Sequence, residues 1–149
     1  MDEKKFWELI NQLNWKKSGD DEAVIRPVVK KLSRVSIEDI FTFEDILSQK
    51  LFELDTEAHA REIGESAYGN DGYFSVDYFL YARCCVVANG REFFEKVRAN
   101  PSEFPKDMVF EALLSIAQQA FELKTGEEFN YDAKVSYETF SNKAGWAAA

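Results

Sequence analysis

The most constraining feature of this sequence is a largely apolar stretch at residues 75–90, SVDYFLYARCCVVANG. After its first turn, Arg83 is the only charged residue. A helix that is apolar on nearly every face has no side to present to water, so it must lie inside the protein. Ser75 is a favourable N-cap, and Asp77 falls in the first turn, where the helix dipole stabilises a negative charge. The sequence therefore predicts a buried central helix over about Ser75–Asn89.

Clear start and stop signals divide the rest of the chain up to Gly126 into further helices. Ser36-Ile-Glu-Asp resembles a capping box that opens a long helix. A glycine-rich turn at 68–72, Asn100-Pro101 and Gly126 each end a helical pattern. Helices are predicted over about residues 1–15, 22–32 (or from Pro27), 37–55, 57–66, 75–89, 91–99 and 104–125. The pattern predicts one all-α domain, a bundle of about six to seven helices over residues 1–146.

The helical period is lost after Gly126. Aromatic and apolar residues are scattered there among polar ones, at Phe129, Tyr131, Val135, Tyr137, Phe140 and Trp146. This pattern predicts an extended aromatic strap laid across the helices, and a short strand within 135–139 would need a partner. Residues 147–149, three alanines, are expected to be a tail left by cloning.

The composition narrows the classes of partner. The chain has 149 residues, 46% of them hydrophobic, and a formal net charge of −9. An acidic chain repels phosphate backbones and anionic membranes, so we expect no nucleic-acid or membrane partner.

The start lacks the features of a signal peptide, and no apolar run is long enough to span a bilayer. Cys84 and Cys85 are adjacent, which suits two buried reduced thiols better than a disulfide. These features predict a cytoplasmic protein.

The central helix also resembles a known pattern. Its matching residues are Ser75, Asp77, Phe79, Tyr81, Arg83 and Gly90, followed by Phe93 or Phe94. They are similar to the motif Ser-Asp-Asp-x-Phe-x-Tyr-Phe-Arg-x-Trp-Leu-Ile-x-x-Gly of a bacterial family, domain of unknown function 4240. With the Phe6-Trp7 start and the Asn100-Pro101 stop, the resemblance extends over roughly Lys5 to Gly126. The sequence departs from the motif at Val76, Ala82 and Cys85. The resemblance implies a mostly helical intracellular domain and carries no activity or catalytic residue.

Arg83 is the sharpest functional signal. Its neighbours three and four residues away are Phe79, Leu80, Val86 and Val87, so no acid on its own helix can pair with it. An unpaired buried charge is costly, so the guanidinium should meet a carboxylate or carbonyls from another segment. Arg83 is then either a structural ion pair between helices, which we favour, or an anion site. Asp77 likewise is either a first-turn dipole partner or an acid at a cleft.

His59 is the only histidine. With Glu62 and Glu65 it could present ligands on one helix face, but carboxylate-bridged metal sites need a second Glu-x-x-His. These charged residues are best interpreted as a solvated face of the helix, and we predict no metal or cofactor. His59 and Glu62 remain candidates for a ligand or ion-pair site. No phosphate loop or nucleophile elbow occurs, so we predict no catalytic residue.

Several large aromatic residues have two interpretations. Trp7, Trp15, Tyr137 and Trp146 could complete the core, or they could anchor an interface, since tryptophan and tyrosine are favoured at binding hot spots. Trp15, beside Lys16 and Lys17, is the best candidate for partial exposure.

Two functional hypotheses follow. The first is a non-catalytic cytoplasmic protein that binds a basic protein partner, with an immunity protein against a basic toxin as its extreme form. The alternative is a small enzyme or anionic-ligand binder that uses Arg83 and Asp77. The charge and the lack of a catalytic constellation favour the first.

Overall fold

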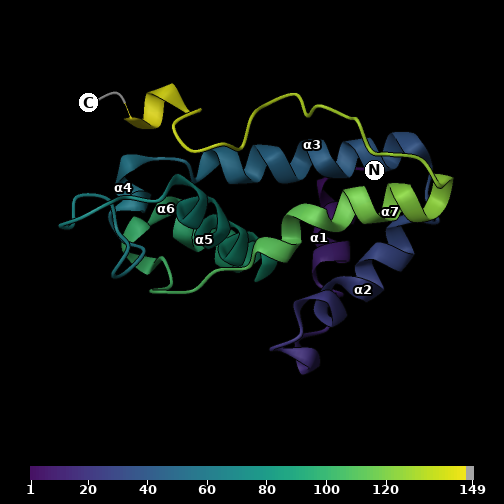
Figure 1. The fold of residues 1–149 in the computed structure, drawn as a ribbon, viewed down its shortest axis with the longest axis horizontal. Coiled ribbons are helices and arrows are strands. Elements are labelled where there is room, and N and C mark those ends of the chain that lie inside the picture. The colour runs from purple at the N-terminus through teal and green to yellow at the C-terminus, as the bar shows by residue number, and fades with distance from the viewer. Residues whose placement is uncertain (147–149) are drawn as a thin grey trace.

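All regular secondary structure in the described part of the chain is helical. The structure is a computed structural model that describes residues 1–146 (Figure 1). Its α-helices are α1 (Glu3–Ile10), α2 (Asp21–Leu32), α3 (Ile37–Glu53), α4 (Glu57–Ala60), α5 (Val76–Ala88), α6 (Arg91–Ala99) and α7 (Ile116–Thr125). Short 3₁₀ helices are η1 (Trp15–Lys17), η2 (Pro101–Glu103), η3 (Glu111–Ser115) and η4 (Lys143–Trp146). The predicted all-α fold is confirmed, and the terminal tail at 147–149 lies outside the described residues.

Helix α5 is the central helix that the sequence predicts. Every residue from Phe79 to Ala88 except Tyr81 is buried. The hydroxyl of Ser75 accepts a hydrogen bond from the amide of Tyr78 at 3.1 Å, so the predicted N-cap is also confirmed. Helices α3 and α6 and the 3₁₀ helix η3 pack around α5, which removes its apolar faces from water.

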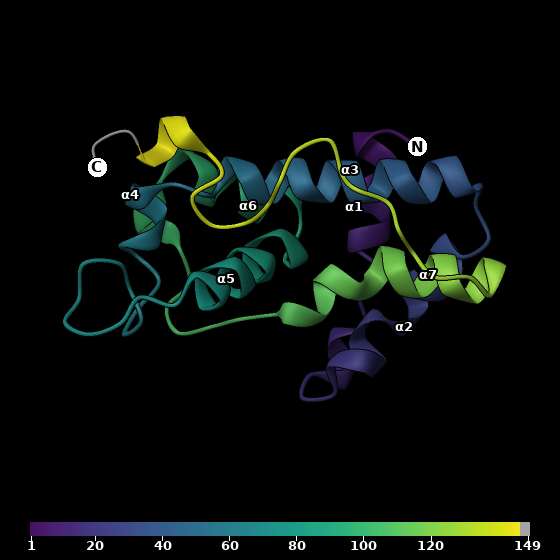
Figure 2. The same ribbon diagram turned by 45° about the horizontal axis from the view of Figure 1, so that its top comes forward.

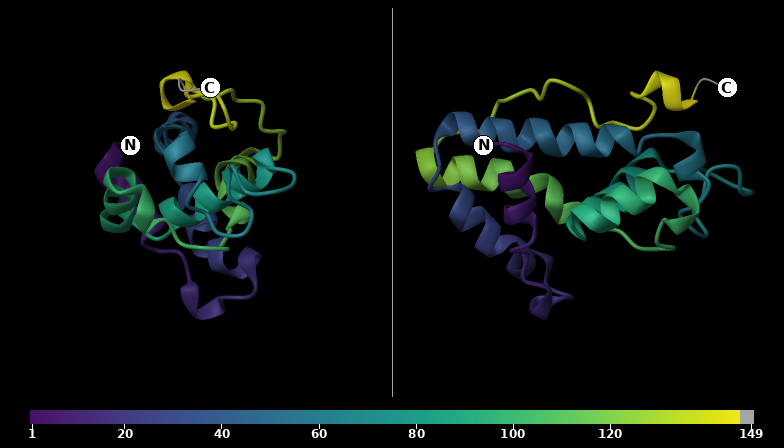
Figure 3. Two further views of the ribbon diagram at one scale, coloured as in Figure 1. Left: turned by 90° about the vertical axis from the view of Figure 1, so that its left-hand side faces the viewer. Right: turned by 180° about the vertical axis from the view of Figure 1, so that it is seen from behind.

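Helix α3 organises the other layers. Its 17 residues span about 25 Å, and it begins at the predicted cap, where Ser36 accepts from the amide of Asp39. Helices α5 and α7 both pack against α3, one toward each end (Figure 2). Seen from the opposite side, α1 and α2 cross the α7 end of the bundle (Figure 3). None of the helices in residues 1–146 combines the length and the apolar character needed to cross a membrane.

Some predicted helix boundaries are wrong. Helix α1 ends at Ile10 and α4 at Ala60, and α2 begins at Asp21 and continues through Pro27. The segment before Glu111 was expected to be helical, but its amides bond to other segments instead. Asp107 N donates to the carbonyl of Ile63, and Phe110 N donates to that of Tyr81. These tertiary bonds hold the segment extended, so the last helix is formed only by η3 and α7.

Residues 127–142, called the strap here, run along α3 in an extended conformation (Figure 1). From 131 to 140 the residues alternate between half-buried and exposed, as expected for an extended chain on a helical layer. Aromatic contacts hold both ends. Tyr131 stacks on Phe41 with ring centroids 4.2 Å apart, and Phe140 meets Trp146 at 4.6 Å. The predicted aromatic strap is confirmed, and it forms no strand within the described residues.

Candidate functional site

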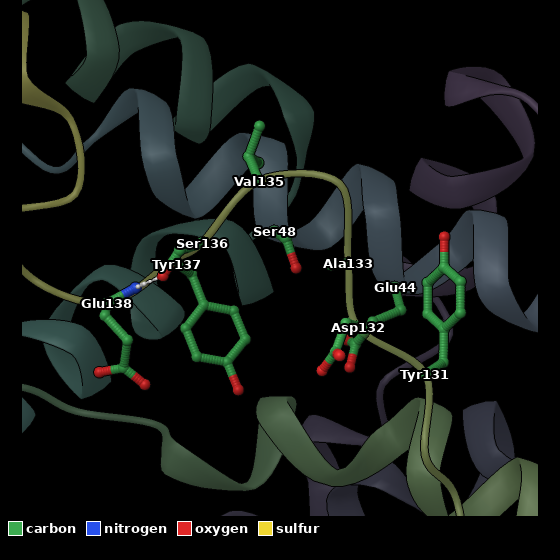
Figure 4. Close-up of a pocket in the computed structure, with 9 residues that line it drawn as sticks. All are labelled: Glu44, Ser48, Tyr131, Asp132, Ala133, Val135, Ser136, Tyr137 and Glu138. Carbon is green, nitrogen blue, oxygen red and sulfur yellow. Dashed lines mark hydrogen bonds between the residues drawn. The ribbon is translucent and has the colours of Figure 1, made fainter.

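A groove of about 340 Å³ lies between helix α3 and the strap (Figure 4). Its lining residues are Glu44, Ser48, Tyr131, Asp132, Ala133, Val135, Ser136, Tyr137 and Glu138. The first two come from α3 and form the floor, while all the others come from the strap. None of them is basic, and Asp132 and Glu138 are exposed at the rim. We call this space the strap groove.

Glu44 and Ser48 are the unusual residues of this groove. They lie four positions apart, so they share one face of α3. Glu44 is 8% exposed and Ser48 0%. Within residues 1–146, neither Glu44 Oε1 nor Ser48 Oγ has a hydrogen-bond partner. Buried polar atoms are normally hydrogen-bonded, so two such atoms in one groove mark a place where donors are missing.

The burial changes the protonation of this site. Burial raises the pKa of Glu44 to about 7, and the neighbouring Asp45 carboxylate adds to the rise. Burial also raises the pKa of Tyr137 to about 12, with Glu44 as the next cause. At neutral pH the Glu44 carboxyl therefore exchanges between its neutral and charged forms, while Tyr137 keeps its proton.

A second acidic groove adjoins the first. It occupies about 480 Å³ between α2, η3 and α7, and Tyr137 lines both grooves. Its carboxylates belong to Asp21, Glu22 and Glu111, and no basic residue lines it. Positive side chains line other grooves: Lys17 of η1 with Arg26 and Lys30 of α2 line one, and Lys134 of the strap lines another. The two acidic grooves thus concentrate negative charge in one continuous region.

Arg83 is fully buried and clamps the strap rather than facing either groove. Its Nη1 donates to the carbonyls of Leu51 and Tyr137, each at 2.9 Å, and its Nη2 donates to Thr139 Oγ1 at 2.9 Å. The guanidinium lies 4.6 Å from the ring centre of Phe79. Burial lowers the pKa of Arg83 to about 10, so it remains charged at neutral pH. An anion could reach this guanidinium only by displacing the strap.

The carbonyl partners are those expected for a buried arginine, but no ion pair within residues 1–146 includes Arg83. Asp77 is exposed in the first turn of α5. The structure therefore does not bring Asp77 and Arg83 together as a pair.

His59 and Glu62 also lie apart from the grooves. The expected solvated face is wrong for His59, which is 4% exposed. Both its ring nitrogens meet protein atoms: Nδ1 lies 2.7 Å from Thr56 Oγ1, and Nε2 lies 2.9 Å from the carbonyl of Val97. Burial lowers the pKa of this imidazole, which favours its neutral form. Glu62 pairs with Lys106 at 3.0 Å on the surface.

The candidate interface aromatics divide into core and surface. Trp7 and Trp146 are buried, whereas Trp15 is 40% exposed and packs against Phe110. Tyr137 is half-buried between the two acidic grooves. Of these four residues, Tyr137 alone lines the candidate site.

Sequence reasoning missed Glu44 and Ser48. The signal was their position at the edge of an apolar stripe, formed in α3 by Ile40, Phe43, Leu47 and Leu51. Polar residues at such an edge usually face water, and nothing local shows that a distant strap covers them.

A scan against protein-family models matches residues 1–123 of the 149-residue chain to the family described as "Protein of unknown function (DUF4240)". Neither the search of curated proteins nor the search of solved structures gave a match. The matched residues include α3 with Glu44 and Ser48, whereas the strap lies beyond them. The chain therefore belongs to the DUF4240 family.

Proposed function

We propose that this chain is a non-catalytic binding protein of the bacterial cytoplasm that recognises a basic segment of another protein. An immunity protein that neutralises a basic toxin would be one example. The observation that carries the proposal is the pair of adjoining acidic grooves. Glu44, Asp132 and Glu138 line the strap groove, and three further carboxylates line the second groove, with no basic residue in either.

Charge complementarity is the physical reason for this assignment. Clustered charges of one sign in a concave surface focus the electrostatic field and speed the approach of an oppositely charged partner. The net charge of −9 acts in the same direction at longer range. An extended basic segment of the partner could lie along both grooves and pass Tyr137, which lines both of them.

Two further features support the proposed setting. Cys84 and Cys85 are buried free thiols, as is usual for proteins of a reducing compartment. Arg83, the cation of the alternative anion-binding hypothesis, is occupied by the strap.

The test compares two charge-reversal variants that change the net charge equally. Asp132→Lys/Glu138→Lys alters the rim of the strap groove, and Glu8→Lys/Glu92→Lys alters exposed positions on α1 and α6. The probe is a fluorescent peptide of alternating lysine and serine, about twelve residues long. Its affinity is measured by anisotropy at low and physiological salt, because exposed charges are screened by salt.

We expect the groove variant to weaken binding about tenfold and the control variant less than about twofold. Equal weakening by the two variants would show that the peptide responds to net charge alone and would overturn the proposal. A failure of the wild-type protein to bind the peptide at low salt would also overturn it.

A further inference from the structure

We propose that Glu44 and Ser48 form a subsite for one primary ammonium group, supplied by a lysine side chain of the partner. This inference rests on the proposed function and names the group that the strap groove recognises. It begins from Glu44 Oε1 and Ser48 Oγ, the two buried oxygen atoms without a hydrogen-bond partner in residues 1–146.

The geometry of these oxygens favours an ammonium group. Residues four positions apart on a helix place their side chains side by side, about 5–6 Å apart at Cβ. One nitrogen between them can donate to both oxygens, because an ammonium carries three donors and no acceptor. In Figure 4 the Ser48 hydroxyl and the Glu44 carboxyl both extend from α3 toward the space beneath the strap.

The charge of the surroundings also favours a cation. Asp132 and Glu138 stand at the rim, and Asp45 follows Glu44 on α3, where it binds the hydroxyl of Tyr131 at 2.7 Å. An ammonium would neutralise the buried carboxylate in a region that has no other positive lining residue.

The protein already holds one buried ammonium in a similar way. Lys50, also on α3, is 6% exposed and lies 2.9 Å from Glu3 Oε1 and 3.7 Å from Glu53 Oε2. The ring of Phe94 lies 5.5 Å from its nitrogen. The strap groove offers a buried carboxylate and the aromatic ring of Tyr137, but no cation from the described chain.

Lysine fits better than arginine for two reasons. A guanidinium binds most strongly when its planar fork meets both oxygens of one carboxylate, whereas the two acceptors here lie on separate side chains. The methylene chain of a lysine can also lie along the apolar parts of Ala133, Val135 and Tyr137 while its nitrogen reaches the floor.

The test uses a peptide with one central lysine and three modified forms of that residue. Trimethyllysine keeps the charge and removes the N–H donors, acetyllysine removes the charge, and arginine replaces the ammonium by a guanidinium. We expect wild-type protein to bind each modified peptide at least about fivefold more weakly. Equal affinity for the lysine and trimethyllysine peptides would overturn the subsite and leave the proposed function intact.

Variants of the protein locate the effect. Glu44→Gln and Ser48→Ala should each remove most of the preference for lysine over trimethyllysine. Glu38→Gln, at an exposed position of α3, should keep it. If Glu44→Gln and Ser48→Ala both retain the preference, the subsite is elsewhere and the assignment fails.

The pH dependence gives an independent readout. Burial raises the pKa of Glu44 to about 7, and the other titratable groups that face it are Asp45, Tyr131, Asp132, Tyr137 and Glu138. Because an ammonium needs the ionised carboxylate, binding should be about tenfold tighter at pH 8 than at pH 6, and Glu44→Gln should lose this dependence.

Small amines separate the possible sources of the ammonium group. n-Butylammonium should displace the lysine peptide in wild-type protein and not in Glu44→Gln. This experiment also distinguishes the two proposals. If n-butylammonium binds and no basic peptide does, the protein partner is rejected and the ammonium-binding subsite is retained. Tighter binding of spermidine than of the lysine peptide would overturn the assignment to a protein side chain.

Discussion

Two buried carboxylates lie under the same strap and have opposite surroundings. Asp55, directly after α3, is 0% exposed and accepts hydrogen bonds from the amides of Phe140 and Asn142 and from the indole of Trp146. Glu44 is 8% exposed, and its Oε1 accepts none within residues 1–146. Glu44 lies within α3 and Asp55 lies two residues after its last residue, Glu53, and the strap packs against both side chains.

The comparison distinguishes a structural carboxylate from a candidate functional one. A buried charge that belongs to the architecture is supplied with donors by the fold itself, as Asp55 is by the strap end. At Glu44 the strap covers the carboxylate without supplying a donor to Oε1. Arg83 adds to the difference, because its guanidinium donates to the strap at Tyr137 and Thr139 and to Leu51, and not to Glu44. We therefore interpret Asp55 as an anchor and keep Glu44 as the candidate binding residue.

The largest expected effect is at the anchor. Asp55→Ala leaves two amides and an indole N–H without their acceptor, so we expect a loss of about 3–5 kcal/mol in the free energy of unfolding. Chemical denaturation followed by tryptophan fluorescence measures it. The control, Asp71→Ala in an exposed turn, should change stability by less than about 0.5 kcal/mol. A loss below about 1 kcal/mol for Asp55→Ala would contradict the anchoring role.

The next effect depends on pH. Because the folded-state pKa of Glu44 is raised from 4.5 to about 7, the folded protein binds more protons than the unfolded chain between these values. Stability contributed by this group is present below pH 4.5 and is lost as the pH rises to about 7. Relative to Glu44→Gln, the wild-type protein should lose on the order of 3 kcal/mol between pH 4.5 and 8. Denaturation curves across this range measure the difference, and parallel stability profiles would show that Glu44 is not desolvated.

The smallest effect compares two serines of α3. Ser36 caps the helix by accepting from the amide of Asp39 at 3.1 Å, so Ser36→Ala should cost about 1 kcal/mol. Ser48 Oγ has no partner, so Ser48→Ala should change stability by less than about 0.5 kcal/mol. Thermal and chemical unfolding compare the two variants. If Ser48→Ala costs as much as Ser36→Ala, the hydroxyl is bonded and the groove is not short of donors.

Much of the fold could be predicted because its signals are local. The apolar run in α5, the caps at Ser36 and Ser75 and the stop at Gly126 are properties of neighbouring residues. The segment before Glu111 was predicted incorrectly because its amides bond to Ile63 and Tyr81, which are distant in sequence. Local patterns do not record such bonds.

The candidate site depends more on contacts between distant parts of the sequence than the fold does. Its floor lies within the region that matches the DUF4240 family, and its cover is the strap beyond residue 123. The properties of Glu44 therefore come from two segments about 90 positions apart, joined by contacts such as that of Tyr131 with Asp45.

The sequence by itself determined the buried central helix, the all-α class, the acidic charge and the extended strap, since each follows from composition or from periodicity within a short window. Only the tertiary structure decided that Arg83 would bind strap carbonyls and that Glu44 would be buried without donors. The physical reason is that desolvation and hydrogen bonding depend on which distant atoms cover a side chain, and that is settled when the strap packs on α3.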